Sequence, residues 1–187
     1  ISEATGQGCP PLLAKALDYA VFPGGARVRP KICKAVALAN NSSDVGLDNA
    51  AASAIELLHC ASLVHDDLPC FDDATQRRGK PSVHAKFGER IAVLTGDALI
   101  VAAFQTIATH AIHAVRTERV PLVTAIVARG VGAPHGICAG QAWECERSVD
   151  LSRYHRAKTG ALFVAATCAG AASAGVDPGP WVNLGAS

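Results

Sequence analysis

The apolar positions along the chain show no sustained alternation of period two, which argues against a sheet. Ala, Leu, Ile and Val dominate instead, in long alanine-rich stretches that favour helix. The pattern predicts helices at about residues 9–20, 27–40, 46–67, 90–111, 119–130, 137–147 and 151–174, and the start of another at 180–184.

Short breaks separate these predicted helices. They are a Gly-Gly turn at residues 24–25, the polar run 40–43, Pro69, and the glycine- and proline-rich segments 132–136 and 175–180. A chain of 187 residues can bury one sizeable core but is short for two domains. The sequence therefore predicts an all-α, single-domain helical bundle.

Composition excludes several classes of protein. Half of the residues are hydrophobic, so the chain is not disordered, and 17 basic against 16 acidic side chains give no footprint for nucleic acid. Seven cysteines lack the spacing of a zinc site or a disulfide scaffold, which favours a reducing cytoplasm. The longest apolar run, residues 91–107, is interrupted by Asp97, and we predict no transmembrane segment.

The most informative segment is an acidic cluster at the carboxyl end of the predicted helix 46–67. The negative end of the helix dipole and mutual repulsion both disfavour carboxylates at such a place. Mg²⁺ would remove both objections. A solvated acidic loop is the alternative. The cluster contains four carboxylates within eight residues, those of Asp66, Asp67, Asp72 and Asp73.

A basic segment follows the acidic cluster directly. Arg77, Arg78 and Lys80 lie a few residues downstream, where guanidinium groups could bind phosphate oxygens that a metal leaves free. Carboxylates for a metal beside paired arginines suit a diphosphate. The chain has no P-loop motif, which makes a nucleotide-triphosphate fold a poor alternative.

Five segments resemble motifs of the trans-polyprenyl diphosphate synthase family, in the order in which the family has them. The resemblance covers nearly the whole chain and is strongest to bacterial geranylgeranyl diphosphate synthases of carotenoid and bacteriochlorophyll pathways. It implies an isoprenoid synthase fold, a helical bundle around a central cavity. The matching segments are 24–30 (GGARVRP), 66–72 (DDxxxxD) with its RRGKP tail, 94–99 (LTGDAL), 140–141 (GQ) and 158–160 (KTG).

The resemblance also implies roles for individual residues. Asp66 and Asp72 would bind two Mg²⁺ ions that hold an allylic diphosphate, with Asp67 in support, and Asp97 would be structural. Arg77 would contact the same diphosphate, and the remaining allylic contacts would come from Lys158, Thr159 and Gln141. Isopentenyl diphosphate would be held by Arg29, His59 and Arg78. His59 precedes Asp66 by two helical turns, so the two side chains share a helix face.

The implied reaction is the head-to-tail condensation of isopentenyl diphosphate with dimethylallyl, geranyl or farnesyl diphosphate, through ionisation, condensation and elimination. Mg²⁺ and cationic side chains would stabilise the departing diphosphate. Family resemblance also implies a homodimer. Bulky residues before the first aspartate motif limit product length in this family. Ala61 and Ser62 are small, so the twenty-carbon geranylgeranyl product is expected over the fifteen-carbon one.

Three features depart from the family pattern. Ala26 replaces a lysine, and Glu144 replaces an aspartate that often follows the GQ motif. A second aspartate-rich motif would fall beyond Ser187, so we expect residues 1–187 to be one prenyltransferase domain without its C-terminal third.

These departures leave alternatives open. The chain could be a non-catalytic regulatory subunit of a heteromeric synthase, or its product could be farnesyl diphosphate. A class I terpene cyclase shares the metal chemistry but does not need Arg29, His59 and Arg78.

Overall fold

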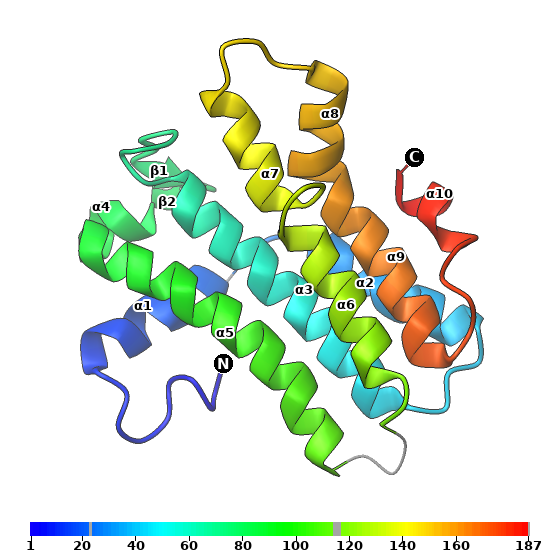
Figure 1. Cartoon of the computed structure of the whole chain (residues 1–187). Coiled ribbons are helices and arrows are strands. Elements are labelled where there is room, and N and C mark those ends of the chain that lie inside the picture. Colours follow the sequence, from blue (N-terminus) through cyan, green and yellow to red (C-terminus); the bar gives the residue numbers. More distant parts are fainter. Residues whose placement is uncertain (23, 114–116, 187) are drawn as a thin grey trace. The chain divides into compact units, whose positions relative to one another are not determined.

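The structure, a computed structural model, describes residues 1–22, 24–113 and 117–186 and is mostly helical, which confirms the all-α prediction (Figure 1). Ser187 lies outside the described residues. The helices are α1 (Pro11–Val21), α2 (Val28–Ala39), α3 (Val45–Asp66), α4 (Val83–Phe87), α5 (Glu89–His113), α6 (Val120–Val131), α7 (Ile137–Ala142), α8 (Leu151–His155), α9 (Ala161–Ala174) and α10 (Trp181–Ala186).

Local capping explains where several of these helices begin and end. The Ser82 hydroxyl accepts a hydrogen bond from the Ala85 N–H at the start of α4, and the Asp150 carboxylate accepts one from the Arg153 N–H at the start of α8. Gly175 ends α9 with a φ of 83°, a left-handed conformation that favours glycine.

The structure differs from the sequence prediction in three places. The stretch 137–147 is not one helix, because α7 gives way to the 3₁₀ turn η1 (Trp143–Cys145). The stretch 151–174 contains a π-helical turn, η2 (Arg156–Gly160), between α8 and α9. A hairpin of β1 (Gln76–Arg77) and β2 (Lys80–Pro81), followed by the short helix α4, was not predicted because these elements are too short for a periodic signal.

The chain divides into two compact units. The first comprises Ile1–Ala26 and Leu57–Ala103, and the second Arg27–Glu56 and Phe104–Ser187. In the first unit α1 packs on α4, where the Tyr19 and Phe87 rings meet edge to face at 5.4 Å. The Tyr19 hydroxyl donates to the Pro81 carbonyl at 2.8 Å, which ties the hairpin to α1.

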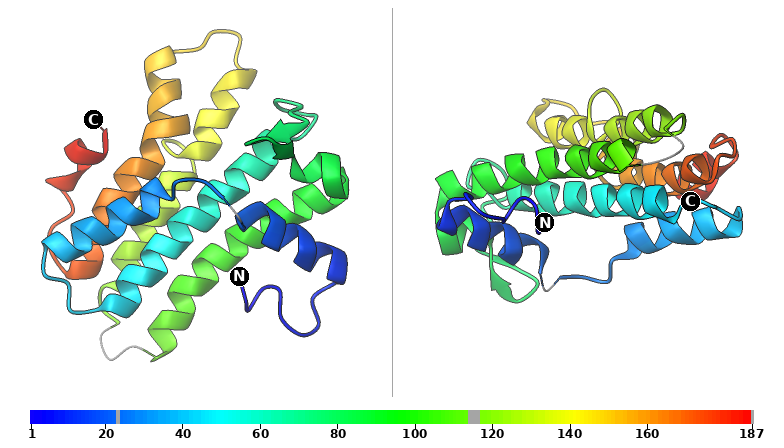
Figure 2. Two further views of the ribbon diagram at one scale, coloured as in Figure 1. Left: turned by 180° about the vertical axis from the view of Figure 1, so that it is seen from behind. Right: turned by 90° about the horizontal axis from the view of Figure 1, so that it is seen from below.

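In the second unit, α9 is the central helix and packs against α2, α6 and α10 (Figure 1; Figure 2 shows α2 alongside α9 from behind). Small residues permit the close approach. A Cβ at Gly170 would lie 2.2 Å from the Cys33 carbonyl oxygen of α2, and one at Gly130 of α6 would lie 2.6 Å from the Ala165 Cβ. Any side chain at either glycine would push the helices apart.

The alanine-rich helix α3 is deeply buried, as its sequence predicts. Ala51, Ala54 and Ile55 are 0% exposed and Leu58 is 1% exposed. Helix α5 is longer than the apolar run that we identified in the sequence. Its residues Glu89–Ile112 are long and apolar enough to cross a membrane by length and composition alone, a test that core helices of soluble proteins also pass.

Candidate functional site

The acidic cluster lies where α3 ends and the chain turns back on itself. The Asp72 N–H donates to the Asp66 carbonyl at 3.0 Å, and the Ala74 N–H donates to the Asp67 carbonyl at 3.1 Å. These backbone hydrogen bonds close the loop over the last turn of α3. The loop therefore returns Asp72 to the residue that begins the DDxxxxD motif.

This loop brings two of the predicted metal ligands together. Carboxylate oxygens of Asp66 and Asp72 lie within 4.8 Å of each other. Two carboxylates at this distance repel each other, and the helix C-terminus adds to the negative potential. Oxygen ligands in a negative field are what Mg²⁺ prefers, so the donor set fits this ion.

Asp67 is held by Arg77, whose Nη2 also lies 3.6 Å from Asp66 Oδ2. Its side chain is 3% exposed, and it accepts hydrogen bonds from Arg77 Nε and from Arg77 Nη2. The hydrogen bond to Asp67 raises the pKa of Arg77 above its ordinary value, with further contributions from the charges of Asp66 and Asp72. The buried carboxylate thus fixes Arg77 at the edge of the cluster, and the pair leaves Nη1 uncommitted.

All three cations of the basic segment line a small cavity in the first unit. Arg77, Arg78 and Lys80 lie around about 100 Å³ of space, together with Tyr19 and Gly24. The Arg78 guanidinium rests on the Gly-Gly turn, since a Cβ at Gly25 would lie 2.5 Å from Arg78 Nη1. Gly25 is therefore needed for this arginine to occupy its place.

The remaining first-unit candidates lie on α3. His59 is half-buried and its carbonyl accepts the Ser62 hydroxyl hydrogen bond at 2.8 Å. Ala61 is 1% exposed. The helix is continuous from His59 to Asp66, as the two-turn spacing requires.

A second cluster, in the second unit, brings together residues that are far apart in the sequence. Both Glu144 oxygens are used. One accepts from Gln141 Nε2 at 2.8 Å, and the other accepts from the Tyr154 hydroxyl at 2.6 Å and from Lys158 Nζ. Gly140 makes this possible, because a Cβ there would lie 2.3 Å from the Lys158 backbone nitrogen. The GQ and KTG motifs are thus in direct contact.

Sequence reasoning missed Tyr154 as a member of this second cluster. The hydrogen bond to Glu144 is the main reason that its pKa lies above the ordinary value for tyrosine, and desolvation adds to the shift. The four-residue spacing between Tyr154 and Lys158 within one helical segment could have suggested that the two share a face.

Arg29 of α2 also lies in the second unit. Its guanidinium carbon is 4.2 Å from the centroid of the Phe163 ring on α9, a cation–π contact. Arg27, which precedes α2, forms an ion pair with Glu56 of α3. The two arginines of the GGARVRP motif therefore have different surroundings.

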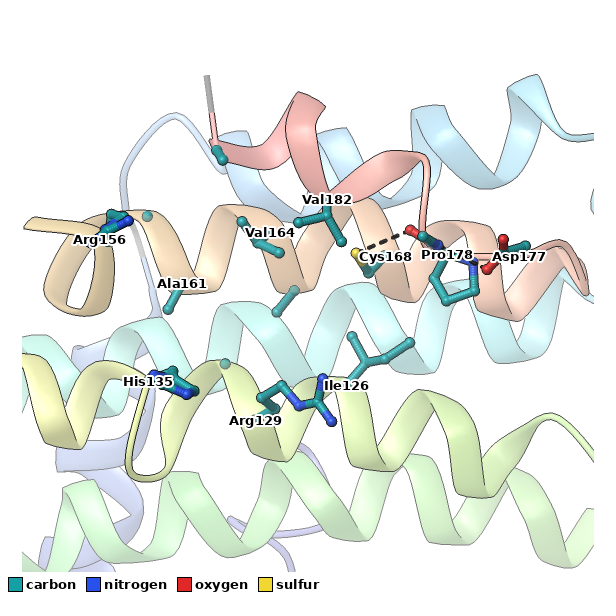
Figure 3. A pocket seen from close by; sticks show the side chains of 15 residues that line it. Ile126, Arg129, His135, Arg156, Ala161, Val164, Cys168, Asp177, Pro178 and Val182 are labelled. Atoms are coloured by element: carbon teal, nitrogen blue, oxygen red, sulfur yellow. Dashed lines mark hydrogen bonds between the residues drawn. The ribbon is translucent and has the colours of Figure 1, made fainter. Parts of the chain in front are cut away.

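Two larger cavities flank α10 in the second unit. One, of about 540 Å³, has apolar walls from α6, α9 and α10, with Arg129, His135 and Arg156 at its edge (Figure 3). The other, of about 900 Å³, is lined by α2, α9 and α10 and includes Thr159. Thr159 is the only predicted site residue among the described residues lining these two cavities.

Comparison with known proteins agrees with the order of the motifs and the helical architecture. Residues 10–185 match the Polyprenyl synthetase family. The chain belongs to this family. It is 56% identical over its whole length to a geranylgeranyl diphosphate synthase of Cereibacter sphaeroides, and 54% identical over 98% of its length to the enzyme of that name from Rhodobacter capsulatus.

A solved structure supports the same assignment. The apo structure of a FPP/GFPP synthase from Zymomonas mobilis superposes on this polyprenyl synthetase chain with a TM-score of 0.86, at 31% identity, covering 99% of this chain and 69% of that one. The chain spans 64% and 62% of the lengths of the two bacterial relatives.

Proposed function

We propose that this chain belongs to an enzyme that condenses isopentenyl diphosphate with an allylic diphosphate to give geranylgeranyl diphosphate. The observation that carries the proposal is the approach of the Asp66 and Asp72 carboxylates within 4.8 Å, in a unit that also presents Arg77. Identity above 50% to two geranylgeranyl diphosphate synthases supports the choice of reaction.

In the proposed reaction the allylic C–O bond breaks and inorganic diphosphate leaves. The allylic carbon then bonds to the terminal alkene carbon of isopentenyl diphosphate, and a proton is lost to restore a double bond. Mg²⁺, when bound, supplies charge that stabilises the departing diphosphate. Asp66 and Asp72 would hold the ion, and Arg77 would bind the diphosphate through the nitrogen that its pair with Asp67 leaves uncommitted.

For isopentenyl diphosphate, we propose Arg29, His59 and Arg78 as the binding residues. The position of Arg78 on the Gly-Gly turn supports this role, because its guanidinium lies against Gly25, the residue before Ala26, which replaces the family lysine. A guanidinium in that place supplies positive charge that the alanine cannot.

For the allylic substrate, we propose Lys158, Gln141 and Thr159. The shared hydrogen bonding of Gln141 and Lys158 to Glu144 supports this assignment, since it fixes both side chains. Glu144 thus takes the place of the aspartate that often follows the GQ motif.

Product length is a separate part of the proposal. Ala61 and Ser62 leave room for a growing chain, and Ala61→Tyr should shift the product from geranylgeranyl to farnesyl diphosphate. Because Ala61 is 1% exposed, the larger ring can also cost about 1–3 kcal/mol by overpacking, so circular dichroism must show a folded variant. A folded variant with an unchanged product profile would contradict the chain-length role.

We also propose that the protein is a cytoplasmic homodimer whose residues 1–187 are part of one prenyltransferase domain. All seven cysteines are free, which is consistent with a reducing compartment. In the first unit, helix α5 exposes the apolar side chains of Val93, Leu94 and Val101, which a second copy could cover. Analytical ultracentrifugation of the wild type and of Val101→Glu would test the pairing.

The proposed reaction is tested by incubating the full-length protein with Mg²⁺, isopentenyl diphosphate and farnesyl diphosphate and identifying the products. Geranylgeranyl diphosphate is the expected result. A folded protein that makes no product even with excess Mg²⁺ would contradict catalysis. That result would favour the regulatory-subunit alternative. A second incubation supplies geranyl diphosphate in place of farnesyl diphosphate. If its final product is farnesyl diphosphate, only the assigned chain length is contradicted.

A further inference from the structure

The LTGDAL motif on α5 has no part in the proposed reaction, yet it contacts the residue that precedes the aspartates. His65 Nε2 lies 3.2 Å from the Val93 carbonyl oxygen of α5. A carbonyl only accepts hydrogen bonds, so Nε2 is the donor. The same nitrogen is 3.7 Å from Asp97 Oδ1.

Gly96 provides the space for this contact. A Cβ built on Gly96 would lie 2.0 Å from His65 Nε2 and 2.4 Å from the neighbouring ring carbon Cδ2. The imidazole therefore lies directly against the backbone of α5, and no residue other than glycine fits beneath it. The ring is 28% exposed, so its position is set by this contact on one side rather than by full burial.

The backbone of His65 is held as well. Its carbonyl accepts the Leu68 N–H at 3.1 Å, the first hydrogen bond of the loop that returns to Asp72. The next residue, Asp66, carries the carboxylate that approaches Asp72. His65 thus joins α5 on one side to the aspartate loop on the other.

We propose that His65 is a positioning residue for the metal site. Its ring packs against Gly96 and donates a hydrogen bond to the Val93 carbonyl. These contacts fix the last turn of α3 and with it the distance between the Asp66 and Asp72 carboxylates. The inference rests on the proposed function for the identity of the ligand, Mg²⁺ with a diphosphate. Groups that orient metal ligands in this way typically contribute about 10- to 100-fold to metal affinity.

Two substitutions of His65 separate positioning from simple packing. The amide nitrogen of glutamine can reach the place of Nε2, whereas the asparagine amide ends near the place of Nδ1 and cannot reach Val93. In the full-length protein, His65→Asn should raise the Mn²⁺ concentration that half-saturates binding by about tenfold or more. His65→Gln should stay close to the wild type. Binding is followed by the electron paramagnetic resonance of Mn²⁺ with inorganic diphosphate present.

Gly96→Ala tests the packing of the His65 ring against Gly96. The added methyl group should displace His65, lower the Tm and weaken Mn²⁺ binding. The double variant His65→Ala/Gly96→Ala removes the clash, so its Tm should recover while its Mn²⁺ binding stays weak. Gly130→Ala is the matched control, since it crowds Ala165 on α9 instead of His65. It should lower the Tm and leave Mn²⁺ binding unchanged.

Equal Mn²⁺ binding by the Gln and Asn variants would overturn the proposal, as would recovery of metal binding together with the Tm in the double variant. Either result would leave the proposed function intact, because the wild type would still bind Mn²⁺ with diphosphate. A wild-type protein that does not bind the metal and diphosphate together would contradict the proposed function itself.

Discussion

The two side-chain clusters differ in how their charges are balanced. The acidic cluster gathers three carboxylates, those of Asp66, Asp67 and Asp72, around Arg77, which binds chiefly to Asp67. In the second cluster a single carboxylate, Glu144, receives hydrogen bonds from Gln141, Tyr154 and Lys158.

This difference indicates different tasks. The carboxylates of the acidic cluster repel one another, and a bound cation would reduce this repulsion, so the cluster suits metal binding. The second cluster is satisfied by its own groups, so it suits the fixed presentation of Lys158 to an anionic ligand. Substitutions in the two clusters should therefore fail in different ways.

The largest effect is expected from Asp72→Asn. The amide keeps the shape of the side chain and removes its charge, so kcat/KM should fall on the order of 10²- to 10³-fold, as for other groups that stabilise developing charge. The change also relieves the repulsion between residue 72 and Asp66. Asp73→Asn is the matched control, since Asp73 is 69% exposed and 3.9 Å from His84. Loss of activity in both variants would contradict a specific role for Asp72.

Arg77→Ala should affect stability as well as activity. It leaves the Asp67 carboxylate buried without its partner, which should lower the free energy of unfolding by about 1–3 kcal/mol. Urea denaturation at neutral pH measures this loss. Adding Asp67→Asn should restore part of the stability, because the buried charge is gone. If Arg77→Ala alone is as stable as the wild type, the ion pair does not hold the cluster together.

Glu144→Gln should have a smaller effect. Lys158 loses its charged partner, and KM for the allylic substrate should rise about tenfold, equivalent to about 1.4 kcal/mol. The KM for isopentenyl diphosphate should not change. Steady-state kinetics with each substrate varied in turn would show this. An unchanged KM for the allylic substrate would contradict the role of Glu144 in fixing Lys158.

The smallest effect concerns pH. The folded state raises the pKa of Tyr154, so its contribution to stability is fully present below the unfolded pKa of about 10 and is lost as pH rises through the higher folded value. Spectroscopic titration at 295 nm should show that Glu144→Gln lowers this pKa. An unchanged pKa would show that Glu144 is not the cause of the shift.

Much of the fold could be predicted from the sequence because long alanine-rich stretches between strong breaks leave few options other than helix. The short hairpin gave no periodic signal, and the other two places where the prediction was wrong meet at a tertiary contact. Gly140 of α7 lies directly against the Lys158 backbone of the π-helical turn, and no local propensity encodes that contact.

The candidate site shows the same limit. The DDxxxxD spacing indicated that Asp66 and Asp72 act together, and the loop hydrogen bonds show how they meet. The spacing could not show that Asp67 binds Arg77, because the order of residues in a sequence does not reveal which partner each side chain contacts. Nor could it link His65 to Gly96, which are 31 positions apart.

The most direct test of the acidic cluster as a metal–diphosphate site is calorimetric titration of inorganic diphosphate into the full-length protein, with and without Mg²⁺. The account predicts binding that requires Mg²⁺, is lost in Asp72→Asn and is kept in Asp73→Asn. Binding of the same strength without Mg²⁺, or binding that Asp72→Asn leaves unchanged, would contradict it.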